Sequence, residues 1–97
     1  MTEIKLTESK FMAQVIQLAK MYGWQCYFTW KSINSPAGFP DLVMVHDARL
    51  IFAELKADKG KVSLSQQEWL DALKKTKAEV YCWFPKDWPE LQEVITK

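Results

Sequence analysis

The sequence lacks the features that would place a protein in or across a membrane. No apolar run approaches the length of a membrane span, and the N-terminus does not have the charged-then-apolar pattern of a signal peptide. Cysteine is scarce: Cys26 and Cys82 form no motif, and each lies in an apolar, strand-like run. They are expected to be small buried residues in a reducing compartment. We therefore expect an intracellular, cytoplasmic protein with no membrane partner and no organic cofactor.

Net charge is also low. The 97 residues carry 13 Lys and Arg against 12 Asp and Glu, a formal charge of +1. This argues against a protein that coats nucleic acid through bulk charge, although it leaves room for a local basic groove. There are no repeats, low-complexity tracts or long linkers, so residues 1–97 are expected to form one domain. Apolar residues, by contrast, are abundant, and the surplus of aromatic surface, including five tryptophans, favours self-association.

Hydrophobic spacing predicts alternating helices and strands. From about Thr7 to Tyr22 apolar residues recur at helical spacing, with Thr7 as N-cap and Gly23 as the C-terminal stop. The other expected helices run from Ser63 or Ser65 to Thr76 and from Glu90 to Ile95, after a break at Pro85–Pro89. The expected strands are 24–30, 41–45, 50–56 and 80–84, with a loop at 31–40.

The order α-β-β-β-α-β-α predicts an α/β sandwich, with a mixed central sheet flanked by helices. The strands at 41–45 and 50–56 are apolar on successive residues, so helices are expected to cover both faces of the sheet. The core-facing stripe of the second helix is expected to be Leu64, Trp69, Leu70, Ala72 and Leu73.

The stretch from Gly38 to Lys56 carries charges at the ends of apolar segments. Asp41 begins one strand, while Glu54 and Lys56 end the next and share a face because they are two residues apart. Antiparallel pairing through a hairpin at 46–49 would place Asp41 beside Glu54. Charges in such places are costly when buried without partners.

Two converging carboxylates repel each other, and a hard cation resolves the repulsion. Mg²⁺ prefers oxygen ligands and keeps several waters. It would polarise a phosphate oxygen and activate a water that attacks phosphorus. Lys56 would orient that water or stabilise charge developing on the phosphate. The alternative is a plain surface salt bridge between Glu54 and Lys56, with Asp41 merely starting a turn after Pro40; the pattern alone does not decide between them.

Three motifs occur together: Gly38-Phe-Pro-Asp41, Glu54-Leu-Lys56 and Ser63-x-x-Gln66. In this order and spacing the chain, from the first helix through the strand at 80–84, resembles the VRR-NUC (virus-type replication-repair nuclease) family of the PD-(D/E)xK nuclease superfamily. The resemblance implies a restriction-endonuclease-like fold and a DNA endonuclease that depends on Mg²⁺, with Mn²⁺ able to substitute. It also implies that Asp41 and Glu54 hold the metal with the carbonyl of Leu55, and that Lys56 is the catalytic lysine.

Two further site residues have competing interpretations. Ser63-x-x-Gln66 is a capping box, so Gln66 either satisfies a helix N-terminus or, as the resemblance implies, binds water or phosphate in the site; the two roles are compatible. Glu8 lies on the apolar stripe of the first helix by its spacing to Phe11. The resemblance makes it a carboxylate that approaches the metal, for a second ion or through water. The helix dipole alone could also account for it. Glu3 is the rival if the helix begins earlier.

Other polar and aromatic residues are candidates for contact with DNA. Lys31, Lys59 and Lys61 lie in loops beside the expected cleft and are the natural phosphate contacts, together with Ser63. Trp30 is a candidate for base stacking, whereas Trp69 is assigned to the core. Exposed or solvated positions are expected for His46 and Asp47 in the hairpin, and for Lys74, Lys75 and Lys77 at a helix end.

The resemblance also bears on substrate and assembly. Small stand-alone proteins that resemble this chain tend to be homodimers, and some cut Holliday junctions or other branched DNA. A dimer supplies the two sites that symmetrical cutting needs. The alternatives are a nuclease for linear or flapped DNA, a catalytically silent nucleic-acid-binding module on the same fold, and a small protein-interaction domain in which the charges are incidental.

Overall fold

The computed structural model describes residues 7–29 and 36–97, and in them four strands form one sheet in the order β1-β2-β3-β4. The strands are β1 (Gln25–Phe28), β2 (Leu42–His46), β3 (Arg49–Leu55) and β4 (Glu79–Trp83). The helices are α1 (Glu8–Met21), α2 (Leu64–Lys74) and α3 (Trp88–Thr96), with a short 3₁₀ helix at Pro85–Asp87. The predicted element order is therefore confirmed.

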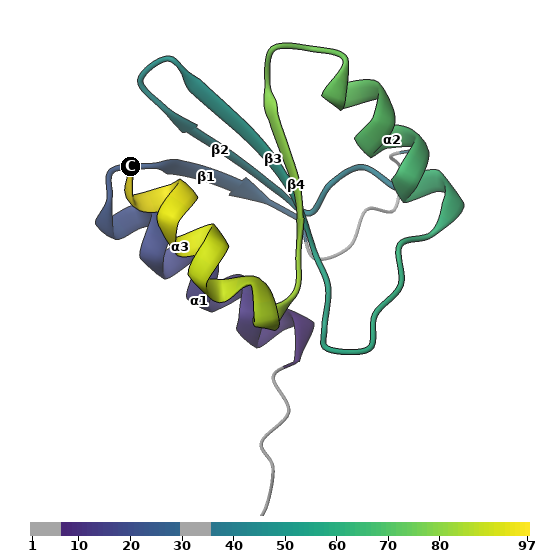
Figure 1. Ribbon diagram of the computed structural model, residues 1–97, viewed down its shortest axis with the longest axis horizontal. Coiled ribbons are helices and arrows are strands. Elements are labelled where there is room, and N and C mark those ends of the chain that lie inside the picture. The colour runs from purple at the N-terminus through teal and green to yellow at the C-terminus, as the bar shows by residue number, and fades with distance from the viewer. Residues whose placement is uncertain (1–6, 30–35) are drawn as a thin grey trace, which may run out of the picture.

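The sheet is mixed, as predicted. β1 pairs with β2 and β2 with β3 in antiparallel fashion, whereas β4 runs parallel to β3 and is reached through α2. α1 and α3 lie on one face of the sheet and α2 lies on the other (Figure 1). None of the helices in the described residues is long and apolar enough to cross a membrane.

The hydrophobic core lies between the sheet and the α1–α3 layer. Along β2 and β3 every second residue faces this layer, which is why burial alternates there. Burying each such aliphatic side chain contributes about 1.5–3 kcal/mol. The fully buried members from the two strands are Leu42, Met44, Ile51, Ala53 and Leu55, and those from α1 are Phe11, Val15 and Ala19.

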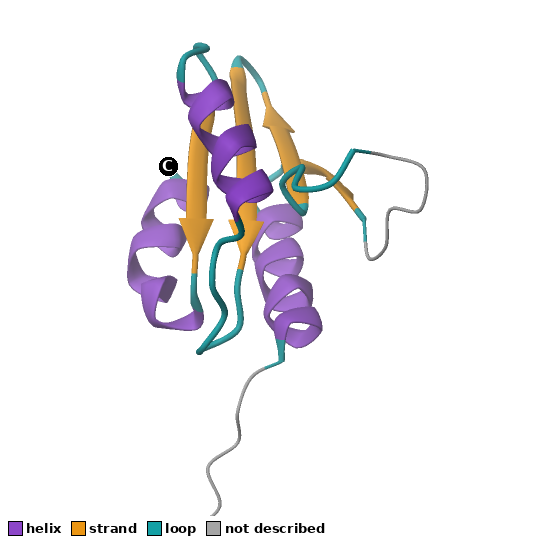
Figure 2. Ribbon diagram, turned by 90° about the vertical axis from the view of Figure 1, so that its right-hand side faces the viewer, coloured by secondary structure: helices purple, strands orange, loops and turns teal. Residues whose placement is uncertain are grey.

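Helices flank both faces, as predicted, but among the described residues the face toward α2 is covered less completely than expected. α2 packs against β4, and Figure 2 shows it in front of the part of the sheet farthest from β1. Tyr27, Val45 and Leu50 on β1–β3 consequently keep exposed side chains. The stripe expected on α2 is also wrong in part: Leu70 is buried, but Leu64, the first residue of the helix, is 79% exposed.

Three smaller expectations also need correction. α3 begins at Trp88 rather than Glu90, because Pro89 is tolerated in the first turn of a helix, where its missing N–H has no partner to lose. The hairpin turn is shorter than expected, since His46 pairs with Arg49. Cys26 and Cys82 are free thiols, as expected, but they are half-buried rather than buried.

The hairpin end of the sheet is fastened to α3 by Arg49. Its guanidinium donates to both carboxylate oxygens of Glu79, at 2.8 and 2.7 Å, and to the carbonyls of Val94 and Lys97. A bidentate charged pair of this kind is among the stronger hydrogen-bonded contacts. His46 lies at the same end, with its ring 5.4 Å from that of Trp24. This end is thus occupied by structural contacts and lies opposite the end where Asp41 stands.

Gly38 holds the loop before β2 against α2. Its φ is +95°, a conformation that side chains rarely adopt. A Cβ placed there would lie 2.5 Å from the carbonyl carbon of Ser65 in the first turn of α2. The loop and the helix therefore touch through their backbones, and this contact sets where Asp41 begins β2.

We expect Gly38→Ala to lower the free energy of unfolding by about 1–3 kcal/mol, because it combines backbone strain with a clash against Ser65. Urea denaturation followed by circular dichroism measures the change. Ala37→Ser, at the exposed position directly before the glycine, serves as the control and should shift stability by less than about 0.5 kcal/mol. Equal stability of the two variants would show that the close approach of loop and helix is not required.

Candidate functional site

The strand register places the two predicted carboxylates together. Leu42 of β2 pairs with Ala53 of β3, so the residue before Leu42 stands beside the residue after Ala53. Asp41 accepts a hydrogen bond through Oδ2 from the backbone N–H of Leu55, at 3.1 Å. The negative charge of Asp41 also acts on Glu54. The adjacency expected from hairpin pairing is therefore present.

Glu54 is the most deeply buried charged residue of the site, at 1% exposed. Its Oε2 accepts from the Lys56 ammonium at 3.1 Å and from the Gln66 amide at 2.9 Å. Its Oε1, by contrast, has no hydrogen-bond partner among the described residues. Asp41 can hydrogen-bond Glu54 only while one of the two carboxyls is protonated. The ionised pair therefore leaves this buried oxygen without a donor, which is costly, and open to a donor or a cation from outside the chain.

Lys56 is buried as well, at 8% exposed, and its ammonium is held in place. Nζ donates to Gln66 Oε1 at 2.8 Å, in addition to its contact with Glu54. The stem lies under the following turn: a Cβ at Gly60 would stand 3.2 Å from the Cβ and Cδ of Lys56. The packing of Gly60 on the lysine stem was not predicted from the sequence. Its one sequence signal is a glycine in the turn just after the lysine.

Gln66 caps α2 and also enters the site. Its Oε1 accepts from the backbone N–H of Ser63 at 2.9 Å, and its backbone N–H donates to Ser63 Oγ at 3.2 Å, which completes the capping box. The same side chain bridges Lys56 and Glu54. The helix cap thereby fixes an amide between the two charges, and α2 is tied to the end of β3. Binding of water or phosphate by this amide stays a prediction.

Burial makes the carboxylate pair reluctant to ionise. Desolvation raises the pKa of Glu54 to about 7, and the neighbouring charge of Asp41 adds to this, while Lys56 opposes it. Desolvation also raises the pKa of Asp41, against the hydrogen bond from Leu55. Two acids with raised pKa values in contact are the arrangement that a bound cation would relieve.

Glu8 lies within electrostatic reach of the site. Its pKa is raised, first by burial and then by the charge of Asp41, and Lys56 opposes the rise. The side chain is nevertheless exposed, so its expected place on the buried stripe of α1 is wrong. Among the described residues no three His, Cys, Asp or Glu side chains gather closely enough to hold a metal ion together, so Glu8 does not complete such a cluster with Asp41 and Glu54. Its rival Glu3 lies outside the described residues.

The residues predicted to contact DNA divide into two sets. Lys59, Lys61 and Ser63 are exposed in the segment that joins β3 to α2, beside Lys56. Trp30 and Lys31 lie outside the described residues, so their roles stay predictions. Trp69, assigned to the core, is only half-buried, in edge-to-face contact with Phe39.

The donor set fits a hard divalent cation. Asp41 has one oxygen engaged by Leu55, Glu54 has one oxygen without a partner among the described residues, and both are carboxylate donors of the type that Mg²⁺ prefers. Two protein carboxylates are enough for Mg²⁺, because the ion usually keeps several of its waters. A ligand role for the Leu55 carbonyl stays a prediction.

A family model describing the VRR-NUC domain matches residues 6–83, a range that contains Asp41, Glu54, Lys56 and Gln66. The chain belongs to the VRR-NUC family. It is thus a nuclease-type domain, and the resemblance noted in its motifs is confirmed. A solved structure described as a VRR_NUC domain protein has the same fold, with a TM-score of 0.70 at 22% identity over 95% of this chain and 87% of the other. Among curated proteins no match is found.

The raised pKa of Glu54 predicts how stability depends on pH without metal. The folded state favours the protonated carboxyl, so the protonated Glu54 raises the free energy of unfolding. This stabilisation is fully present below about pH 4.5 and is lost as pH rises through about 7. The loss is on the order of 3 kcal/mol for a shift of this size. Chemical denaturation across this range in chelator should show it, and Glu54→Gln should flatten the slope. Glu68→Gln, at an exposed position on α2, is the control; a slope unchanged in Glu54→Gln would refute the assignment.

Proposed function

We propose that this VRR-NUC domain is a divalent-metal-dependent endonuclease that hydrolyses DNA phosphodiester bonds. The observation that carries the proposal is the Glu54 Oε1 left without a partner by the described residues, beside Asp41, with the Lys56 ammonium 3.1 Å from the other oxygen of the same carboxylate. Two oxygen donors and a fixed positive charge thus lie together where the start of β2 meets the end of β3. Phosphoryl transfer needs little more than positioning and charge stabilisation, which is what such a site offers.

Mg²⁺ is the proposed cofactor, with Mn²⁺ able to substitute. Asp41 and Glu54 would hold it, with the Leu55 carbonyl as a third protein ligand and Glu8 acting through water or toward a second ion. When bound, the ion supplies Lewis-acid chemistry at a phosphate oxygen. It would also draw the pKa of Glu54 back down, because a nearby positive charge favours the ionised carboxylate.

Lys56 is the proposed catalytic lysine and Gln66 its positioning partner. The amide oxygen of Gln66 and the carboxylate of Glu54 hold the ammonium at 2.8 and 3.1 Å, so its charge is already in place before substrate arrives. A preorganised ammonium stabilises negative charge on a phosphate without rearrangement, or orients the attacking water. The exposed side chains of Lys59, Lys61 and Ser63 would contact the phosphates on either side.

The other classes of function are less well supported. A silent DNA-binding module or a protein-interaction domain has no need for a buried lysine bound to a buried glutamate. Desolvation of such a pair costs several kcal/mol per ion, which the attraction between the charges and their hydrogen bonds must offset. Branched DNA, such as a Holliday junction, is the proposed substrate. The net charge of +1 suits recognition by shape and a local groove better than binding by bulk charge.

We expect the wild-type protein to cut at least one DNA among labelled four-way junction, flap, single strand and duplex, with Mg²⁺ or Mn²⁺ but not with chelator. Lys56→Ala, Asp41→Ala and Glu54→Ala should each lower the cleavage rate by at least about 100-fold, as loss of a charge-stabilising group does. Gel assays at matched folded fraction measure this. A wild type that cuts none of these DNAs, or a Lys56→Ala variant as active as wild type, would refute the proposal.

Ser63→Ala is the matched control for Gln66→Ala in the same assay. Both lose part of the helix cap, which costs about 1 kcal/mol of stability. Only Gln66→Ala also releases Lys56 and Glu54. The cleavage rate should therefore fall much further in Gln66→Ala than in Ser63→Ala, which loses only the cap and one proposed phosphate contact; equal rates would restrict Gln66 to capping.

The proposed active form is a homodimer. β1 is an edge strand of the described sheet, and Tyr27 on it is 64% exposed. Together with Val45 and Leu50 it forms an exposed apolar surface on the face that α2 leaves uncovered. A second copy of the chain, related by a two-fold axis, would bury this surface and bring in a second site for the opposite strand.

Sedimentation velocity should find a dimer for the wild type and a monomer for the double variant Val45→Lys with Leu50→Lys. The charges would be buried without partners at the interface, which costs several kcal/mol. Met21→Lys, on an exposed apolar residue of α1, is the control and should stay dimeric. A monomeric wild type, or dissociation by Met21→Lys alone, would contradict this interface.

A further inference from the structure

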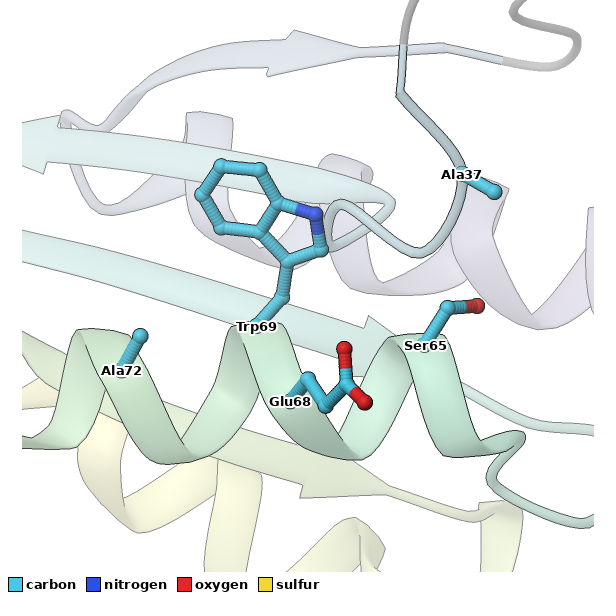
Figure 3. A pocket seen from close by; sticks show the side chains of 5 residues that line it. All are labelled: Ala37, Ser65, Glu68, Trp69 and Ala72. Carbon is cyan, nitrogen blue, oxygen red and sulfur yellow. The ribbon is translucent and has the colours of Figure 1, made fainter.

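A small pocket lies beside the proposed catalytic site on the same helix. It is lined by Ala37, Ser65, Glu68, Trp69 and Ala72 and has a volume of about 280 Å³. Figure 3 shows the four α2 side chains along one side of the helix, with Ala37 facing them from the loop. This volume is at the lower end of ligand pockets, so it suits a flat fragment better than a large molecule.

The pocket and the catalytic site have no lining residue in common, but they are built on the same helix and loop. Gln66, which holds Lys56 and Glu54, follows Ser65 directly in α2. Ala37 lies four residues before Asp41, in the loop that Gly38 presses against the backbone of Ser65. A strand whose phosphate lies at Asp41 and Glu54 therefore has this pocket within reach of a neighbouring nucleotide.

The chemistry of the lining points to a nucleobase. The Trp69 indole is held by Phe39 in an edge-to-face contact, with centroids 5.0 Å apart, and Phe39 is braced in turn by Phe52. Aromatic rings fixed in this way are the usual platforms for unpaired bases. Glu68 is exposed at the pocket, and no described residue bonds its carboxylate. An ionised carboxylate only accepts hydrogen bonds, which suits the amino group of a base.

We propose that this pocket receives one unpaired nucleobase of the strand being cut, stacked on Trp69, with Glu68 accepting a hydrogen bond from its exocyclic amino group. The inference rests on the proposed nuclease function and narrows its substrate. Cytosine, adenine and guanine carry such an amino group, whereas thymine does not. A paired base is stacked between its neighbours in the duplex and cannot stack on Trp69, so the substrate has an unpaired nucleotide next to the cut, as branched and flapped DNA can provide.

The test uses flap and junction DNAs in which each nucleotide near the cleavage position is replaced in turn by cytosine, thymine or an abasic residue. Binding is measured by fluorescence anisotropy with chelator, and cleavage with Mg²⁺. At one position we expect the abasic residue to weaken binding roughly 5- to 150-fold, the range that base–aromatic stacking provides. Thymine in place of cytosine there should weaken binding roughly 10- to 150-fold, as for one hydrogen bond to a charged group.

The variants separate the two contacts. Trp69→Ala should remove the abasic penalty, and Trp69→Phe should keep part of it. Glu68→Gln should keep the penalty but equalise cytosine and thymine, because an amide can both donate and accept. Trp88→Ala, on a tryptophan lining a different pocket, and Glu90→Gln, on an exposed acid of α3, are the matched controls and should change neither.

Failure of this inference is distinguishable from failure of the proposed function. If DNA is cut but no position shows the abasic penalty, the base pocket is refuted and the nuclease stands. A preference for cytosine that survives in Glu68→Gln refutes the role of Glu68, even where Trp69→Ala does not fold. If the wild type neither binds nor cuts any DNA, both proposals fall.

Discussion

The rest of this structure depends on one buried contact, the carboxylate of Glu54 against the ammonium of Lys56. Placing both charges at the covered end of β3 is unfavourable unless each finds partners. Each charge has the other as a partner, and Gln66 from the cap of α2 bonds both. Asp41 stands beside the pair and its charge acts against that of Glu54, while the turn at Gly60 packs against the lysine stem. The loop of Gly38, α2 and the end of β3 thus meet at one point because of this pair.

The same arrangement explains why the two faces of the sheet are so different. The face toward α1 and α3 holds nearly all the buried apolar side chains and supplies the stability of the domain. The other face carries the site, a single helix and exposed apolar residues. The carboxylate pair lacks some of its hydrogen-bond partners and so lowers the stability of the fold, and burial of apolar side chains on the opposite face offsets this loss. Unfavourable local arrangements of this kind are found mainly at functional sites.

Much of this could be predicted from sequence, because it follows from short-range rules. Period-two alternation and hairpin pairing placed Asp41 beside Glu54, and the capping-box pattern placed Gln66 at the start of α2. What could not be predicted depends on packing between distant segments. Helical spacing predicts which face of the helix carries Glu8 or Leu64, but not whether another segment packs on that position. Both side chains are exposed. The contact of Gly60 with Lys56 has no periodicity to reveal it.

DNA and a second copy of the chain would both bind on the side of the sheet that carries α2, which limits where each can lie. Glu54, the Trp69 pocket and the exposed residues Tyr27, Val45 and Leu50 all belong to the side of the sheet on which α2 lies. A second copy seated over β1–β3 would leave the α2 end open, and DNA reaching Lys56 would then lie along the rim of that interface. Binding of DNA and assembly of the dimer would in that case be thermodynamically coupled, since DNA at the rim would contact both copies.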